Sequence, residues 1–180
     1  MSVHIWYFCT MNNNQLNKNE AFDDDPEHYF DDQQFSTVVL NSVDFTLKNV
    51  DEIKNLVALL TSGIREDKDQ ALLLLKREDG RELLMSAVAS KEFRDVRNIL
   101  VAACWESGLD FSKYFESFII IALSGNFIEC MESVTVIENM ENIHAHKFKD
   151  LAIQKLEETI KTENEKNVLY NQLLDFLRKT

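Results

Sequence analysis

The sequence predicts an all-α protein, a stack of seven or eight helices in a repeating order, and three observations predict it. The chain has four glycines; Gly63 and Gly108 are 45 residues apart, as are Gly80 and Gly125. Glycine often marks the end of a helix, so this even spacing indicates a repeated helical unit. The only proline is Pro26, and from residue 49 onward apolar side chains recur at helical spacing.

Residues 1–48 are expected to form an acidic extension in front of a helical-repeat domain that spans 49–180. The extension holds eight acidic residues and two lysines, and this is half of the net charge of −12. An amide-rich tract at 12–19 and acidic residues at 23–32 offer little to a core, so we expect part of it to be disordered. Docking onto a groove of the domain stays open because aromatic residues lie among and beside the acids of this stretch: Phe22, Tyr29, Phe30 and Phe35.

The end of the extension contains two short β-prone runs, at 35–40 and 43–47, on either side of Asn41 and Ser42. The pattern is compatible with a β-hairpin. It is equally compatible with a first irregular helix, and both interpretations stay open.

The first unit of the domain is predicted to contain three helices. The first helix begins near Asn49 and is closed by Gly63. Its apolar stripe has the spacing i, i+3, i+4 and i+7: Ile53, Leu56, Val57 and Leu60. The second helix, 66–77, has four consecutive leucines at 72–75, and we expect it to be buried between other helices. Gly80 separates it from the third helix, 81–90.

The second unit repeats this order. Its first helix carries an apolar stripe from Val96 to Ala103 and ends at Gly108, within Glu-Ser-Gly-Leu, which matches Thr-Ser-Gly-Ile at Gly63. The next helix contains 111–123 and is apolar on all faces, so it should be buried. Its β-branched run at 119–121 also fits a strand, but the longer stripe around it favours a helix. Gly125 then precedes a helix over 127–140.

Two amphipathic helices, 145–161 and 163–179, are predicted to close the domain. The expected apolar residues of the first are Phe148, Leu151, Ala152 and Leu156, and those of the second are Val168, Leu169, Leu173 and Phe176. A repeat array needs a polar terminal unit, since an open end would expose core. We therefore interpret this pair as a C-terminal cap.

Three motifs carry a resemblance to a known family. They are Ile53-x-x-Leu56-Val57-x-Leu59-Leu60-x-Ser62, Gln70-Ala71-Leu72-x-x-Leu75 and Asp95-Val96-Arg97-x-Ile99-Leu100. Over about 49–142 the chain resembles armadillo and HEAT repeats, although it lacks the proline common in HEAT turns and the glycine pair typical of armadillo turns. The resemblance implies a right-handed α–α superhelix with one concave surface for protein partners.

Composition argues against several classes of partner and compartment. A net charge of −12 disfavours nucleic acid and anionic membrane surfaces as ligands. The three cysteines, Cys9, Cys104 and Cys130, have no disulfide or zinc spacing. The apolar run at 3–9 is too short for a signal sequence, and no run is long enough for a membrane span. We expect a soluble cytoplasmic protein with reduced thiols.

Candidate catalytic and metal-binding groups are sparse. His144 and His146 are the only close histidine pair, and on a helix their side chains diverge. Glu129 and Glu132 share a helix face, but paired carboxylates act as acid and base only in a suitable cleft. None of the common catalytic or nucleotide-binding motifs is present in the sequence. The sequence therefore predicts no enzyme, no metal site and no cofactor.

The predicted function is an intracellular protein-interaction module or scaffold. The first-helix row offers five candidate partner-binding residues: Glu52, Asn55, Arg94, Arg97 and Asn98. An alternative is an acidic regulatory or immunity-type protein that occupies a basic site on its partner. A third hypothesis is an enzyme that uses the Glu129 and Glu132 pair or the His144 and His146 pair.

Overall fold

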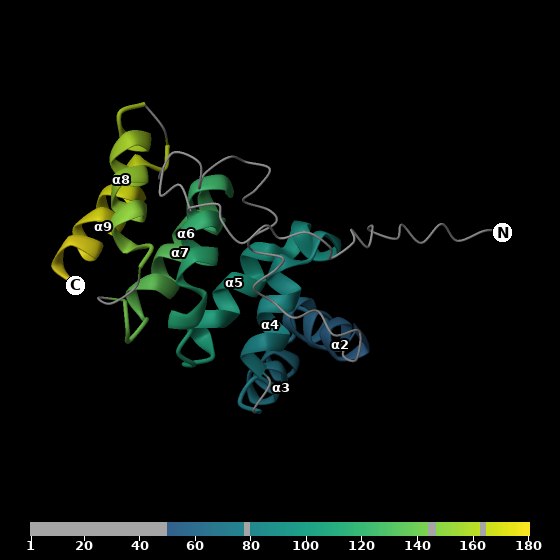
Figure 1. Ribbon diagram of the computed structural model, residues 1–180. Helices are drawn as coiled ribbons and strands as arrows, with labels where there is room; N and C mark the ends of the chain where they lie inside the picture. The colour runs from purple at the N-terminus through teal and green to yellow at the C-terminus, as the bar shows by residue number, and fades with distance from the viewer. Residues whose placement is uncertain (1–49, 78–79, 144–146, 163–164) are drawn as a thin grey trace, which may run out of the picture.

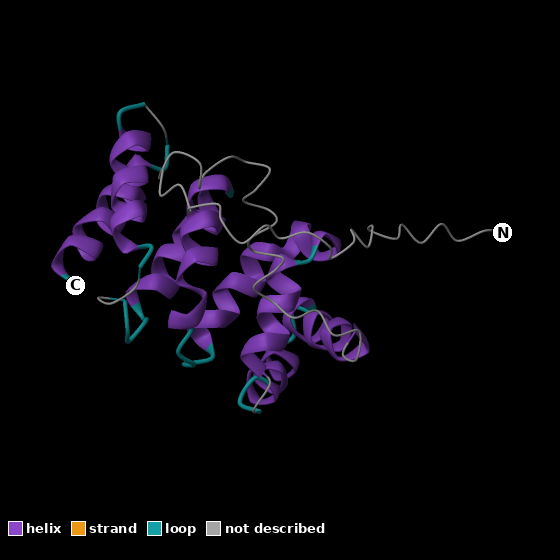
Figure 2. Ribbon diagram, viewed as in Figure 1, coloured by secondary structure: helices purple, strands orange, loops and turns teal. Residues whose placement is uncertain are grey.

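The computed structural model describes residues 50–77, 80–143, 147–162 and 165–180, and every regular element in these ranges is helical (Figure 2). The α-helices are α2 (Val50–Thr61), α3 (Arg65–Leu74), α4 (Gly80–Ala89), α5 (Arg97–Glu106), α6 (Phe115–Ser124), α7 (Phe127–Glu138), α8 (Lys149–Ile160) and α9 (Asn167–Lys179). Two short 3₁₀ helices, η3 (Lys91–Val96) and η4 (Ser112–Tyr114), precede α5 and α6. The all-α prediction is confirmed for this part of the chain.

Several predictions concern residues outside the described ranges. They include the acidic extension, the hairpin or irregular helix at 35–47, and the histidines at 144 and 146.

The helices follow one another in space as they do in sequence (Figure 1). Helix α2 packs on α3 and α4, and α4 packs on α5. Helix α5 packs on α7, which also contacts α6 and α9, and α9 pairs with α8. Most of these contacts therefore join helices one or two places apart in sequence, and one continuous core runs through the array.

Burial is greatest in the middle of the array. Helix α6 buries seven of its ten residues, including the Ile119–Ile121 run, which confirms a buried helix rather than a strand. Helices α3 and α8, which lie at the two ends of the array, bury far fewer residues. These are Ala71 in α3, and Ala152 and Leu156 in α8. A helix at the end of a stack has a neighbour on one side only, so one narrow stripe suffices to cover it.

The prediction that the leucine-rich helix is buried on every face was wrong. Leu75 is fully buried, but Leu73 is 67% exposed, and Leu72 and Leu74 are only partly buried. Helix α3 packs mainly on α2 and lies at the N-terminal end of the described array. Four consecutive leucines point around the whole helix, whereas α3 has a partner on one side.

The two matched glycine stops are confirmed. Gly63 follows α2 with φ 74° and Gly108 follows α5 with φ 67°, a left-handed conformation that glycine adopts without steric cost. The preceding serines make the same hydrogen bonds in both turns. Ser62 Oγ donates to Leu59 O (3.2 Å) and accepts from Ile64 N (3.1 Å). Ser107 Oγ donates to Cys104 O (2.8 Å) and accepts from Leu109 N (3.3 Å).

The other glycine pair is not equivalent. Gly80 is the first residue of α4, not a spacer before it, and a methyl group there would overlap the carbonyl of Leu75. Gly125 ends α6 in an extended conformation, with ψ 176°. The 45-residue spacing therefore corresponds to equivalent turns at Gly63 and Gly108, and not at Gly80 and Gly125.

The C-terminal helices are present as predicted, but the buried stripe of α9 differs. Its buried residues are Tyr170, Leu173, Leu174 and Leu177, whereas Val168 is exposed. These four have the spacing i, i+3, i+4 and i+7, so the stripe includes a tyrosine that the prediction left out.

Candidate interaction surface on helices α5 and α7

Helices α5 and α7 lie side by side and run in the same direction. Arg97, the first residue of α5, binds Glu129 in the first turn of α7 through two hydrogen bonds of 2.7 and 3.0 Å. At the other end, Trp105 of α5 and Val136 of α7 line one hollow. The two helices therefore form a single continuous face.

The Arg97–Glu129 ion pair is largely shielded from solvent, with side chains 19% and 6% exposed. Glu129 also completes a capping box with Asn126 at the start of α7, through bonds of 2.8 and 2.9 Å. Burial opposes ionisation of Glu129, but the hydrogen bonds from Arg97 and from the Asn126 backbone lower its pKa. Glu129 is therefore an ionised structural group that joins α5 to α7.

The five predicted partner-binding residues are spread over three elements. Glu52 and Asn55 are exposed on α2, Arg94 is exposed in η3, and Asn98 is partly buried on α5. In the part of the chain that the structure describes, no side-chain hydrogen bond or ion pair joins any two of them. Glu52 faces Arg77 at 3.9 Å, and the Arg97 guanidinium is engaged by Glu129. Their role in partner binding stays a prediction.

Apolar side chains that the sequence reasoning did not single out are exposed on the same two helices. Trp105, at the end of α5, is 39% exposed, and its Nε1 donates to Glu132 Oε2 of α7 at 2.7 Å. Ile128 and Met131 are also exposed, and they share one face of α7 because they are three residues apart. Ile128 also lies four residues before Glu132, so it is next to Glu132 on the helix surface. In the sequence, these exposed side chains could have been recognised as apolar residues that lie outside the buried stripe of each helix.

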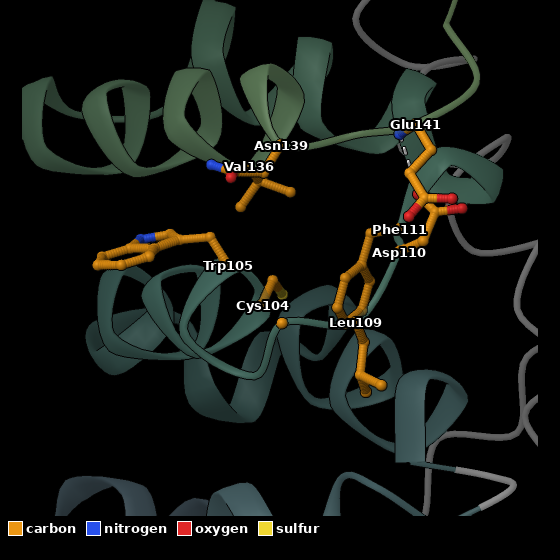
Figure 3. A pocket seen from close by; sticks show the side chains of 9 residues that line it. Cys104, Trp105, Leu109, Asp110, Phe111, Val136, Asn139 and Glu141 are labelled. Atoms are coloured by element: carbon orange, nitrogen blue, oxygen red, sulfur yellow. Dashed lines mark hydrogen bonds between the residues drawn. The ribbon is translucent and has the colours of Figure 1, made fainter.

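A hollow of about 100 Å³ lies beside Trp105, between the C-terminal ends of α5 and α7 (Figure 3). Its walls combine apolar and polar side chains: Cys104, Trp105, Gly108, Leu109, Asp110, Phe111, Val136, Asn139 and Glu141. Cys104 is fully buried, and burial raises the pKa of its thiol well above the ordinary value. The thiol is therefore a packing group and not a nucleophile.

Asp110 organises the polar end of the hollow. Its Oδ1 accepts hydrogen bonds from the Ser112 backbone (3.0 Å) and hydroxyl, and from the Glu141 backbone at 3.5 Å. Ser112 Oγ also accepts from Asn142 N (3.2 Å). Burial opposes ionisation of Asp110, but these hydrogen bonds and the charge of Arg81 lower its pKa. The loops that follow α5 and α7 are thereby tied together.

The enzyme hypothesis finds no assembled acid–base pair at Glu129 and Glu132. Glu129 is bound to Arg97, while Glu132 accepts the indole hydrogen of Trp105. Within the described ranges, no group of three or more His, Cys, Asp or Glu side chains is placed to hold a metal ion. Across the same ranges, no helix is both long and apolar enough to cross a membrane.

No family model, curated protein or solved structure matches this chain. We therefore infer function from the geometry of the surface itself.

Proposed function

We propose that this protein is a cytoplasmic, non-enzymatic protein-interaction module and that the face formed by α5 and α7 is its binding surface. In this proposal the helices form a right-handed superhelix of the armadillo or HEAT type. The matched serine–glycine turns after α2 and α5, 45 residues apart, support a repeated unit. Arrays of this kind present a preformed surface, so little ordering is needed on binding.

The observation that carries the proposal is the placement of Trp105. Its ring is exposed, yet it is held in one orientation by the hydrogen bond to Glu132, and Ile128 and Met131 extend the apolar surface along α7. Tryptophan is enriched among the residues that dominate binding energies, because it buries a large rigid surface. Below this face, the Arg97–Glu129 pair holds the two helices together.

Site-directed photocrosslinking in the cells that make the protein tests the proposal. A photoreactive phenylalanine analogue at Met131 should crosslink a discrete protein partner, and the same analogue at Asp175, an exposed residue of α9, should not. Trp105→Ala should reduce the Met131 crosslink at least tenfold, as expected for an anchor worth more than about 1.4 kcal/mol. Equal crosslinking at both positions, or a yield that Trp105→Ala leaves unchanged, would contradict the proposal.

A second candidate function is favoured by the net charge of −12. An acidic protein of this size could occupy the basic site of a partner, as an inhibitor or immunity-type protein does. Association would then weaken steeply with salt, since long-range charge attraction is screened. Binding through Trp105 and its apolar neighbours would change little with salt. Measuring the crosslink yield from Met131 at two ionic strengths separates the two functions.

A further inference from the structure

We propose that the hollow between the ends of α5 and α7 receives one lysine side chain of the partner protein, with its ammonium group at the carboxylates of Asp110 and Glu141. This inference rests on the proposed function, because it names the chemistry that the α5–α7 face recognises.

The size of the hollow selects a single side chain. Sites for small molecules and cofactors usually measure about 300–1,000 Å³, whereas this hollow measures about 100 Å³. That volume equals the space of about three water molecules. Because Gly108 leaves open space where a side chain would begin, the backbone does not close the hollow.

The walls divide the hollow into an apolar part and an anionic end. Figure 3 shows the Trp105 indole at one end and the carboxyl groups of Asp110 and Glu141 at the other. Val136 and Phe111 lie between them. A lysine matches this order, because its four-carbon stem packs on apolar surface while the charged head reaches a polar end.

The charges favour a cation over other occupants. Asp110 Oδ2 and the Glu141 carboxylate accept no hydrogen bond from the described part of the chain, so both have acceptor capacity to spare. The nearby Arg81 donates to the Asp110 backbone carbonyl at 3.2 Å and not to the carboxylate. An anion would be repelled here, and an apolar side chain would desolvate the carboxylates without compensation.

The hydrogen bonding of Asp110 favours lysine over arginine. Arginine binds a carboxylate best through a fork that uses both oxygens. Oδ1 of Asp110 is already engaged by Ser112 and by the Glu141 backbone, so a fork could form at Glu141 alone and would not use both carboxylates. A compact ammonium group needs only single oxygens from separate carboxylates.

Titration of the full-length ¹⁵N-labelled protein with blocked lysine, Nα-acetyl-lysine-N-methylamide, tests this inference by NMR. We expect saturable shifts of the Trp105 indole N–H and the Gly108 amide, with a Kd on the order of millimolar for one side chain. The uncharged norleucine analogue should bind at least tenfold more weakly, and the arginine analogue at least threefold more weakly. Equal binding of lysine and norleucine would overturn the proposal, and equal binding of arginine would overturn the choice of lysine.

Three variants test whether lysine binds at the anionic end of the hollow. Glu141→Gln should weaken lysine binding about fivefold and preserve the fold, because the Glu141 side chain makes no hydrogen bond within the described residues. Asp110→Asn should weaken it further. Asp175→Asn removes the same charge from an exposed position of α9 and should leave the affinity unchanged. Equal losses in all three variants would mean general attraction to an acidic protein and would overturn the proposal.

Different results would reject the α5–α7 face as an interface and the hollow as a lysine-binding site. A Met131 crosslink together with no lysine binding at the hollow would leave the α5–α7 face as an interface and reject the lysine. Saturable lysine binding without any crosslink would reject the proposed face for that partner and keep the hollow as a lysine-binding site.

Discussion

At the scale of single residues, Lys166 shows how one buried charge can bind the backbone carbonyls at the end of another helix. It lies just before α9, and its Nζ donates to the backbone carbonyls of Leu123 (2.8 Å), Gly125 (3.0 Å) and Ala122 (3.4 Å) at the end of α6. The last carbonyls of a helix have no partner within it and carry partial negative charge, so a cation satisfies both needs. The ammonium also lies 5.3 Å from the centre of the Tyr170 ring.

Lys166→Met is expected to lower the free energy of unfolding by about 2–3 kcal/mol, since three carbonyls lose their bonds to the ammonium group. The Tyr170 hydroxyl, at 3.4 Å, remains as a donor to Ala122 and Leu123 only, so Gly125 O is left without this side-chain donor. Lys161→Met removes the same charge from an exposed position and should change stability by less than about 0.5 kcal/mol. Urea unfolding followed by circular dichroism measures both. Similar losses in the two variants would show that Lys166 acts only through net charge.

At the scale of helices, the structure depends on contacts that join elements at their ends. The Arg97–Glu129 pair links the first turns of α5 and α7, and Asp110 links the loops that follow the same two helices. Lys166 joins α9 to the end of α6. These polar contacts help to fix the relative position of helices whose sides are joined mainly by apolar packing.

The Arg97–Glu129 pair makes stability depend on pH. Because the folded-state pKa of Glu129 lies below its ordinary value of 4.5, its contribution is complete above pH 4.5 and is lost as the pH falls through the folded value. Glu129→Gln should cost about 3 kcal/mol at pH 7, where Arg97 is left without its charged partner. Unfolding at pH 7 and pH 3.5 should show this difference shrinking in acid. A difference that stays constant would contradict the assignment.

At the scale of the whole molecule, the helices at the two ends of the array are less buried than those between them. The helices α3, α4, α5 and α6 each have ten residues, so they compare directly. Within them, α3 buries one residue, α4 buries six, α5 buries four and α6 buries seven. Local opening is easiest where few apolar contacts are broken.

Hydrogen exchange should follow this difference in burial. Amides in the middle of α6 should exchange at the rate of global unfolding, those of α4 should be nearly as slow, and those of α3 should exchange at least a hundredfold faster. The reason is that α3 can detach from α2 without exposing the central core. NMR-detected exchange measures each helix separately. Equal protection of α3 and α6 would mean that the array opens only as one unit.

The sequence predicted well those features that neighbouring residues decide. Helical spacing, the absence of proline after Pro26 and the turns at Gly63 and Gly108 depend on interactions within four or five residues. The buried α6 was also predictable, since an apolar helix on all faces must be enclosed. The candidate surface was not found, because Trp105 and Met131 are ordinary apolar residues in amphipathic helices.

By itself, the sequence determined the helical class, the order of the described helices and the two matched turns, because each arises from local backbone preference. The tertiary structure decided which apolar residues are covered and which charges meet. Leu73 is exposed and Leu75 buried because α3 packs mainly on α2. Arg97 meets Glu129, and Lys166 meets the end of α6, only once helices distant in sequence pack together. Burial and pairing depend on the surrounding helices, so no single segment specifies them.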